Sequence, residues 1–314
     1  MGQLASLRQR VVRVPITIVL QGGGARGAWQ AGVLAELVDA DVCDVAGVFG
    51  TSAGAINAAA LSVAAQAGSD ALLDVWTRLA GSAKGQLGRA LLSVPLTYLR
   101  LREAGSSRRT PLFSSKRLRE ALAAAFPGPW SSSSYTYVFA TKLPHAPVAA
   151  RRLPPFAFQA DPGHARFQPF ARGLQGFELV DVLTASACLP MVSPIELGGV
   201  QFADGGVIAN VPASFLTTSG ALAPWGFTLM VLPTSPTAMS ASSEYVDWKT
   251  LELLHEIRPA VVRRTSHVFV VTPRRALGGG LSGLLGGLMS EDSTRDLFRR
   301  GREDAAPFLD SVKA

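Results

Sequence analysis

The pentapeptide Gly50-Thr51-Ser52-Ala53-Gly54 constrains this chain more than any other feature of its sequence. It fits the G-x-S-x-G pattern, which is typical of a serine held on a sharp turn between a strand and a helix. Glycine is needed at Gly50 and Gly54 because such a turn leaves no room for side chains beside the serine. The pattern therefore predicts a hydrolase or an acyltransferase in which Ser52 is the nucleophile.

The composition is that of one large α/β domain. With 314 residues, of which 48% are hydrophobic, the chain is long and apolar enough to bury a sizeable core. Its charged fraction of 17% is too low for a disordered chain. The net charge of +7 favours an anionic partner, such as a membrane surface, and no nucleic-acid-binding motif accompanies it. Two cysteines, Cys43 and Cys188, do not make a disulfide framework.

Two apolar segments raise the question of a targeting signal or a membrane span. The run from Val14 to Leu20 is short and contains Pro15, so it is better interpreted as the first strand than as a signal peptide. The segment 45–69 carries no charge and has the length of a membrane span, but glycines cluster at its turn. We therefore interpret it as a buried strand, an elbow and a buried helix, and we expect a cytoplasmic location with peripheral contact to membranes.

The pattern along the chain predicts strands that alternate with helices, and hence a parallel sheet with right-handed crossovers. A helical insertion, or cap, is expected over about 68–134, and an irregular segment over Leu153–Arg172, which is rich in proline and aromatic residues. The expected strands are Val11–Leu20, Val45–Phe49, Tyr135–Thr141, Phe227–Leu232 and His267–Val271, and the expected helices include Ala28–Ala40, Ala53–Gln66, Ala71–Leu79, Ser115–Ala125, Leu179–Ala187 and Ser293–Arg302.

A glycine-rich loop precedes the first of these helices. Its glycines Gly22, Gly24 and Gly27 satisfy G-x-G-x-x-G, the fingerprint of a dinucleotide site, for which Asp41 or Asp44 would be the ribose ligand. The same amide groups at a helix start could instead stabilise the oxyanion of a tetrahedral intermediate. A dinucleotide site gives no reason for the serine elbow at the next strand end, whereas acyl transfer explains both features.

A serine nucleophile needs a base. The chain has four histidines, and none of them lies in a catalytic motif: His145, His164, His255 and His267. Asp204 is the better candidate, because it ends a strand and is followed by Gly205 and Gly206. A buried aspartate beside a serine hydroxyl has a raised pKa and can act as a general base.

Four short sequence blocks, taken in their order along the chain, resemble the four blocks of the patatin-like phospholipases. They are the loop Gly22–Gly27, the elbow Gly50–Gly54, the segment Ala185–Pro190 and the turn Asp204–Gly206, and Asn210-Val211-Pro212 after the turn is also typical. The resemblance covers about Ile16 to Pro212. It implies a three-layer α/β/α sandwich with a mainly parallel central sheet and a helical cap, with the catalytic domain over 11–272. A Gly/Leu-rich segment and a polar helix, 273–314, are expected to pack on the same domain.

The resemblance also implies a site. Ser52 would attack an acyl ester, Asp204 would take its proton, and no histidine would take part. The backbone of Gly22, Gly23, Gly24 and Ala25 would bind the oxyanion. Gly50 and Gly54 would form the elbow, and Gly205 and Gly206 would support the site. Arg26 would orient the loop or meet an anionic headgroup. No cofactor or metal is expected, and the substrate would be a lipid ester. From its residues, the basic and apolar segment 85–109 fits a contact with an anionic membrane and equally fits a cap helix packed on the core.

Two alternatives stay open at this point. An acyltransferase would use the same acyl-enzyme with an acceptor other than water. A catalytically silent chain would be a lipid-binding or nucleotide-binding module that keeps the loops without the chemistry.

Overall fold

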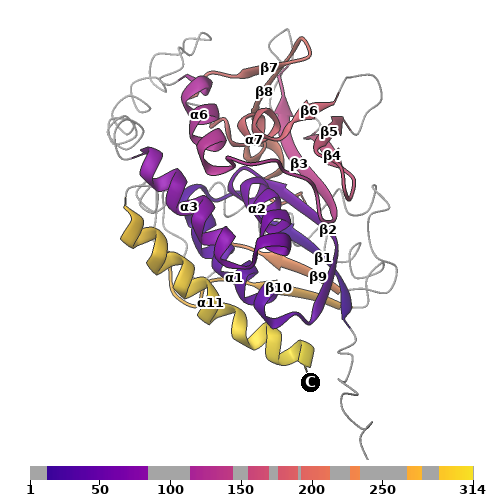
Figure 1. Ribbon diagram of the computed structural model, residues 1–314, viewed down its shortest axis with the longest axis vertical. Coiled ribbons are helices and arrows are strands. Elements are labelled where there is room, and N and C mark those ends of the chain that lie inside the picture. Colours follow the sequence, from indigo (N-terminus) through magenta and orange to yellow (C-terminus); the bar gives the residue numbers. More distant parts are fainter. Residues whose placement is uncertain are drawn as a thin grey trace, which may run out of the picture.

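The computed structural model describes residues 13–83, 114–143, 155–169, 176–189, 192–212, 227–233, 267–277 and 290–313. These residues form a mixed α/β fold in which helices flank one central sheet (Figure 1). The strands are β1 (Val14–Leu20), β2 (Cys43–Thr51), β3 (Tyr135–Lys142), β4 (Pro155–Ala160), β5 (Arg166–Pro169), β6 (Phe177–Glu178), β7 (Ile195–Leu197), β8 (Val200–Asp204), β9 (Phe227–Val231) and β10 (His267–Val271). The helices are α1 (Gly27–Ala40), α2 (Ala53–Ala67), α3 (Asp70–Ala83), α6 (Ser115–Ala125), α7 (Leu179–Ala187), α8 (Gly206–Ala209) and α11 (Glu291–Lys313), with a 3₁₀ turn, η1, at Gly24–Arg26.

The sheet has a parallel half and an antiparallel half. Its path among the described residues is β10-β9-β1-β2-β3-β4-β5-β6, and β8 pairs with β3 and β7. The expected parallel sheet is confirmed for β10, β9, β1, β2 and β3, which run parallel to their neighbours. The other pairings, including that of β8 with β3, are antiparallel. Asp204 is the last residue of β8, so it lies in the antiparallel half of the sheet, beside β3.

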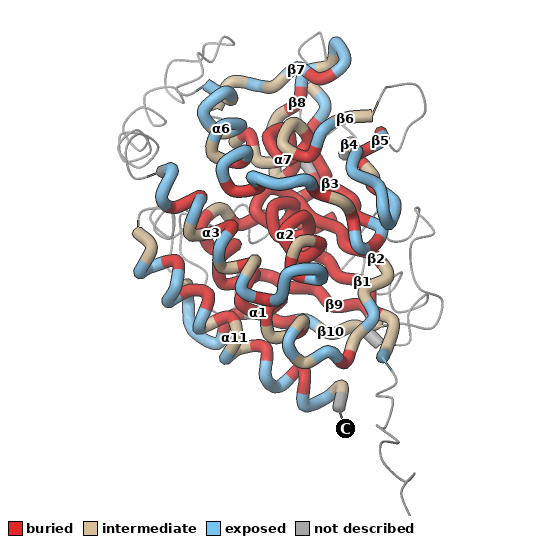
Figure 2. The backbone as a smooth tube through the Cα atoms, viewed as in Figure 1, coloured by how far each residue is buried: buried red, intermediate tan, exposed pale blue. Residues whose placement is uncertain are grey.

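Strand β1 lies at the centre of the parallel half, between β9 and β2. Its alternate residues pack on opposite faces of the sheet: Ile18 belongs to the main core under the helices, and Val19 belongs to a second apolar cluster with Phe49. A central parallel strand is buried on both faces, which explains its continuous apolar sequence. Figure 2 shows the buried residues running through the sheet and the helices next to it. Pro15 fits because β1 pairs with β9 only from Ile16 onward, so the missing amide of proline is not needed there.

The uncharged segment 45–69 forms the end of β2, the elbow and α2, as we expected, and not one continuous helix. No helix in the described parts of the chain has the length and apolar character needed to cross a membrane.

The expectation of an irregular segment over Leu153–Arg172 was wrong, because β4 and β5 lie within it. Two of its prolines stand at strand ends, Pro155 at the start of β4 and Pro169 at the end of β5, where they break few pairings, and Pro162 lies in the turn between the strands. The aromatic residues form the buried face: Phe158 packs against Phe202, and Phe167 stacks on Trp130.

The C-terminal helix is longer than the expected Ser293–Arg302. It begins at Glu291, and Ser290 caps its start by accepting a hydrogen bond from the Ser293 amide at 3.0 Å. It continues through Pro307 to Lys313 because Phe308 and Leu309 are buried in the core.

Helix α11 lies along α1 on the outside of the molecule (Figure 1). The two backbones touch where two glycines face each other's helix. A Cβ on Gly32 of α1 would overlap the carbonyl of Phe298, and one on Gly301 of α11 would overlap the carbonyl of Trp29. The Trp29 indole also donates to Asp304 at 2.9 Å, which fixes the register between the helices.

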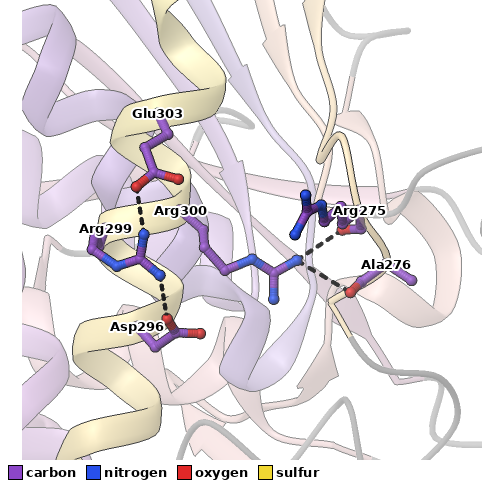
Figure 3. Close-up of polar contacts among 6 residues, drawn as sticks. All are labelled: Arg275, Ala276, Asp296, Arg299, Arg300 and Glu303. Atoms are coloured by element: carbon purple, nitrogen blue, oxygen red, sulfur yellow. Dashed lines mark hydrogen bonds and ion pairs between the residues drawn. The ribbon is translucent and has the colours of Figure 1, made fainter.

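Arginines on α11 join it to its surroundings. Arg302 pairs with Glu36 at 2.9 Å and with Asp39 at 2.6 Å, both on α1. Figure 3 shows two further arginines. Arg299 lies between Asp296 and Glu303 of its own helix, and Arg300 donates to the backbone carbonyls of residues 275 and 276 at 3.0 and 3.2 Å. The segment after β10 is thereby tied to α11.

Several expectations fall wholly or partly on residues outside the described ranges. They concern the basic segment 85–109, the Gly/Leu-rich segment 278–289, His145 and His255. Within the expected cap, α3 and α6 pack against each other, and α3 also packs on α2. The domain boundaries and the cap stay predictions.

The glycine contact between α1 and α11 gives a stability prediction. Gly32→Ala should lower the free energy of unfolding by about 1–3 kcal/mol, because the added methyl group cannot fit against the Phe298 carbonyl. Gly81→Ala is the matched control: it lies in α3 with nothing within 4 Å of the added Cβ, and should be neutral or stabilising by up to about 1 kcal/mol. Urea denaturation of both variants measures the difference. Equal stabilities would show that the helices are not in close contact at Gly32.

Candidate active site

Ser52 occupies the turn between β2 and α2 in a strained backbone conformation. Its φ and ψ are 54° and −119°, a region that residues with a side chain rarely adopt. The flanking glycines are required by close backbone approach, since a Cβ on Gly50 would overlap the carbonyl of Gly54 and one on Gly54 would overlap that of Leu20. The geometry is that of a nucleophile elbow, with the side chain at the end of a parallel strand.

A serine from another helix holds this turn. The Ser52 amide donates to Oγ of Ser186 at 2.9 Å, and that hydroxyl donates to the Phe139 carbonyl of β3 at 2.6 Å. The Ser186 carbonyl in turn accepts the amide of Gly205 at 3.0 Å. Ser186 therefore connects the serine elbow with the aspartate turn. It lies in the block Ala185–Pro190, for which the sequence alone indicated no role for any single residue.

Asp204 ends β8 and is also fixed through its backbone. Its amide donates to the Cys188 carbonyl at 2.8 Å, and its carbonyl accepts the Thr141 hydroxyl at 2.8 Å. On the side chain, Oδ1 accepts the amide of Gly206 at 2.6 Å. Neither glycine of the turn tolerates a side chain, because a Cβ on Gly205 would overlap the Phe139 carbonyl and one on Gly206 would lie 2.8 Å from Oδ1 of Asp204.

The structure brings Asp204 and Ser52 together in a buried position. Ser52 is 7% exposed and Asp204 is 3% exposed. Burial raises the pKa of Asp204 to about 6, while its interactions with the Ser52 hydroxyl and the Gly206 amide lower it. Oδ2 of Asp204 is buried and has no partner at hydrogen-bond geometry among the described residues, so the Ser52 contact is a loose one. Such contacts are often long in enzymes without substrate.

The glycine loop passes directly beside Ser52. A Cβ on Gly22 would lie 3.3 Å from Cβ of Ser52. The Gly22 amide donates to the Asn210 carbonyl at 3.0 Å, so it is already used. The amides of Gly23, Gly24 and Ala25 are not hydrogen-bonded to any other residue that the structure describes. They start η1, where the first amides of a helix have no partners within it.

Arg26 points back at the loop. Its side chain is buried, and its Nε donates to the Gly23 carbonyl at 3.4 Å. Of the two roles expected for it, this contact corresponds to orienting the loop.

Asn210 is a second residue near the site to which the sequence assigned no role. Its carbonyl accepts the Gly22 amide, and a Cβ added to Gly22 or Gly206 would lie 2.5 or 3.1 Å from its Oδ1. The signal was present in Asn210-Val211-Pro212, but only the fold shows that this asparagine lies between the glycine loop and the aspartate turn.

The described residues place no imidazole beside Ser52. His164 lies exposed in the turn between β4 and β5, where its Nδ1 is 3.3 Å from the Pro162 carbonyl. His267 opens β10, but its side chain is outside the described parts. In the same residues, no group of three or more His, Cys, Asp or Glu side chains could hold a metal ion.

Comparison with solved structures shows the fold. The human GIVD cytosolic phospholipase A2 matches 99% of this chain and 64% of its own, with 10% identity and a TM-score of 0.52. The same human protein in complex with methyl γ-linolenyl fluorophosphonate matches 100% of this chain and 60% of its own, with 12% identity and a TM-score of 0.50. VipD from Legionella pneumophila matches 99% of this chain and 72% of its own at 13% identity, with a lower TM-score of 0.42. The chain thus spans less than two thirds of the human phospholipase.

Sequence comparisons lead to the family. Comparison with curated proteins gives no significant match. The family described as Patatin-like phospholipase matches residues 18–217, a range that includes the glycine loop, the serine elbow and the aspartate turn. It covers well over half of the chain, and the fold agrees with it. The chain therefore belongs to the patatin-like phospholipase family.

Proposed function

We propose that this protein is a serine acyl hydrolase that cleaves lipid esters with a dyad of Ser52 and Asp204. One observation carries the proposal: a serine on a strained elbow lies against a buried carboxylate whose Oδ2 has no hydrogen-bond partner among the described residues. A buried carboxylate that is used only for structure is normally fully hydrogen-bonded, so an unpaired oxygen facing a serine favours a role in proton transfer.

The first half of the reaction acylates Ser52. Its hydroxyl proton moves to Oδ2 of Asp204 as Oγ forms a bond to the ester carbonyl carbon, and the carbonyl π electrons move to the carbonyl oxygen. When the tetrahedral intermediate collapses, the bond to the alcohol oxygen breaks and that oxygen takes the proton from Asp204. The products are a free alcohol, such as a lysolipid, and an acylated Ser52.

The second half releases the acyl group. Asp204 takes a proton from water, the water oxygen adds to the acyl carbon, and Ser52 leaves with the proton. A fatty acid is the second product. The pKa of about 6 suits Asp204 to both halves, because the carboxylate is ionised at neutral pH yet basic enough to accept a proton.

The oxyanion would be held by fewer amides than the sequence indicates. Gly22 donates to Asn210, which leaves Gly23, Gly24 and Ala25 as the proposed donors. The start of α2 beside Ser52 adds the partial positive charge of a helix N-terminus. Removal of one donor from an oxyanion hole typically lowers kcat by about 10²–10³, so the identity of these donors matters.

The lipid substrate rests on the family and on the fold shared with a human cytosolic phospholipase A2. We infer an ester of a fatty acid with a phospholipid or a neutral lipid. The +7 net charge supports a substrate that lies in an anionic surface.

Substitution of either dyad residue should abolish hydrolysis while the fold is kept. We expect Ser52→Ala and Asp204→Asn each to lower kcat for phospholipid hydrolysis by about 10³ or more, because nucleophile and base act as one unit. Hydrolysis is measured by mass spectrometry of released fatty acids, and a fluorophosphonate probe should label the wild type at Ser52.

Matched controls exist for both changes. Ser62→Ala removes a buried hydroxyl further along α2, where it contacts Ser133, and Asp181→Asn removes a carboxylate that pairs with Arg119. Both should keep wild-type activity. Hydrolysis that persists in pure Ser52→Ala protein would contradict the proposed nucleophile.

The pH dependence of hydrolysis follows from the Asp204 pKa. Only the ionised carboxylate can accept the serine proton, so kcat/KM should be constant above neutral pH and fall as the pH drops through about 6. A pH–rate profile of a soluble ester tests this. A profile that is flat down to pH 4.5 would exclude Asp204 as the base.

Stability should show the opposite trend. Because the folded-state pKa of Asp204 is raised from 3.8 to about 6, the folded protein binds more protons than the unfolded chain between these values. The free energy of unfolding therefore falls as the pH rises through this window. Asp204→Asn should lack this loss, so the Tm of the variant relative to the wild type should be higher at pH 8 than at pH 4. Equal Tm differences at both pH values would show that burial does not raise this pKa.

A further inference from the structure

Three buried polar side chains lie beneath the glycine loop, away from the reacting atoms. Gln30 comes from α1, Asn57 from α2 and Trp76 from α3, and their exposed fractions are 0%, 0% and 2%. Buried polar groups of this size are costly unless each hydrogen bond is made. Burying three such groups side by side is therefore costly for the fold, which favours a specific role for their hydrogen bonds.

All the hydrogen-bonding groups of the cluster are used. Nδ2 of Asn57 donates to the Gly27 carbonyl at 2.8 Å and to Oε1 of Gln30 at 2.9 Å, and its Oδ1 accepts the indole N–H of Trp76 at 2.6 Å. Nε2 of Gln30 donates to the carbonyls of Val231 at 2.7 Å and of Gln21 at 3.3 Å. An amide flip at Asn57 would direct N–H groups at the indole N–H and an oxygen at two acceptors. The network thus has one arrangement.

This cluster holds both ends of the glycine loop. Gln21 precedes the loop and is bound by Gln30, whereas Gly27 ends the loop and is bound by Asn57. Gln30 also binds the end of β9, and two residues later Pro233 lies against Gly23, where an added Cβ would be 2.8 Å from its Cγ. The middle of the loop, Gly23 to Ala25, has amides without partners among the described residues, and its position is therefore set by the two ends, which are held by hydrogen bonds.

Asn57 connects these fixed ends to the nucleophile. It is on α2, the helix that begins directly after Ser52, so a rigid helical turn separates it from the serine elbow. We propose that Asn57 is a positioning residue that sets the distance between the glycine-loop amides and Ser52, with Gln30 and Trp76 holding it in orientation. The expected effect of Asn57 on catalysis rests on the proposed function. Its expected effect on the position of the loop rests on the hydrogen bonds alone.

Asn57→Asp tests the proposal with almost no change in shape. At pH 8 the new carboxylate oxygen would face the Gly27 carbonyl, so the loop end should be released. Because the oxyanion amides act in the transition state, we expect kcat to fall by about tenfold to a hundredfold with KM nearly unchanged. Binding of a trifluoromethyl ketone, whose adduct with a serine carries an oxyanion, should weaken in parallel, while binding of a non-hydrolysable ether lipid should not.

Trp76→Phe is the milder second variant, and it tests the role of Asn57 if Asn57→Asp does not fold. It keeps an aromatic ring but removes the donor to Asn57. Its matched control is Trp130→Phe, which also loses an indole N–H bond to α2, at the Ala59 carbonyl 3.0 Å away, but whose side chain is hydrogen-bonded neither to Asn57 nor to the ends of the glycine loop. We expect a lower kcat for Trp76→Phe than for Trp130→Phe at temperatures where both are folded.

Hydrogen exchange gives a readout that does not depend on activity. The amides of Gly23, Gly24 and Ala25 should exchange faster in Asn57→Asp or Trp76→Phe than in the wild type, and at the wild-type rate in Trp130→Phe. Unchanged exchange at these amides, or a kcat that falls equally in both tryptophan variants, would overturn the proposal. An inactive wild type would refute the proposed function instead, and exchange would still decide whether Asn57 positions the loop.

Discussion

The hydrogen bond from the Ser52 amide to the Ser186 hydroxyl is the contact on which the site depends. The backbone of Ser52 lies in an unfavourable region and costs of order 1–3 kcal/mol, so it persists only where neighbouring contacts hold it. Ser186 supplies that contact and passes it to the Phe139 carbonyl and the Gly205 amide. Ser186 thus joins Ser52 and the central sheet through its hydroxyl, and the aspartate turn through its backbone carbonyl, which explains how the elbow and Asp204 are held in place relative to each other.

The surroundings of Asp204 do not maximise the stability of the folded protein. A carboxylate with one oxygen unpaired and its pKa raised to about 6 costs free energy whenever it is ionised. The surrounding fold accepts this cost because backbone contacts on β3 and α7 hold the residue in place. Active sites commonly hold such groups, since the properties that suit proton transfer are those that a purely structural residue would not keep.

Much of the fold could be predicted from the sequence, and so could the choice of Ser52 and Asp204 as candidate residues that lie together, because the strands, the elbow and the aspartate turn each follow a local pattern. Apolar runs gave the strands of the parallel half, and the bounds of α6, α7 and β10 agree with prediction. The contacts of Ser186 and Asn57 could not be found, because each is made with residues distant in sequence. Strands β4 and β5 were missed because their prolines indicate irregular structure until their position at strand ends is known. Likewise, Gly22 looked like a free donor until its partner, Asn210, was placed.

The order of strands in the sheet shows that the unit that folds is longer than the range matched by the family. The matched range, 18–217, ends before β9 and β10, yet β9 is the strand that covers one side of β1. A fragment that ended at residue 217 would leave β1, a largely apolar strand, as an open edge and α1 without α11. Open apolar edges recruit other chains, so such a fragment would be expected to form aggregates while carrying every motif residue of the site. The part of the chain that carries β9, β10 and α11 therefore completes the folding unit, although it adds no residue to the family signature.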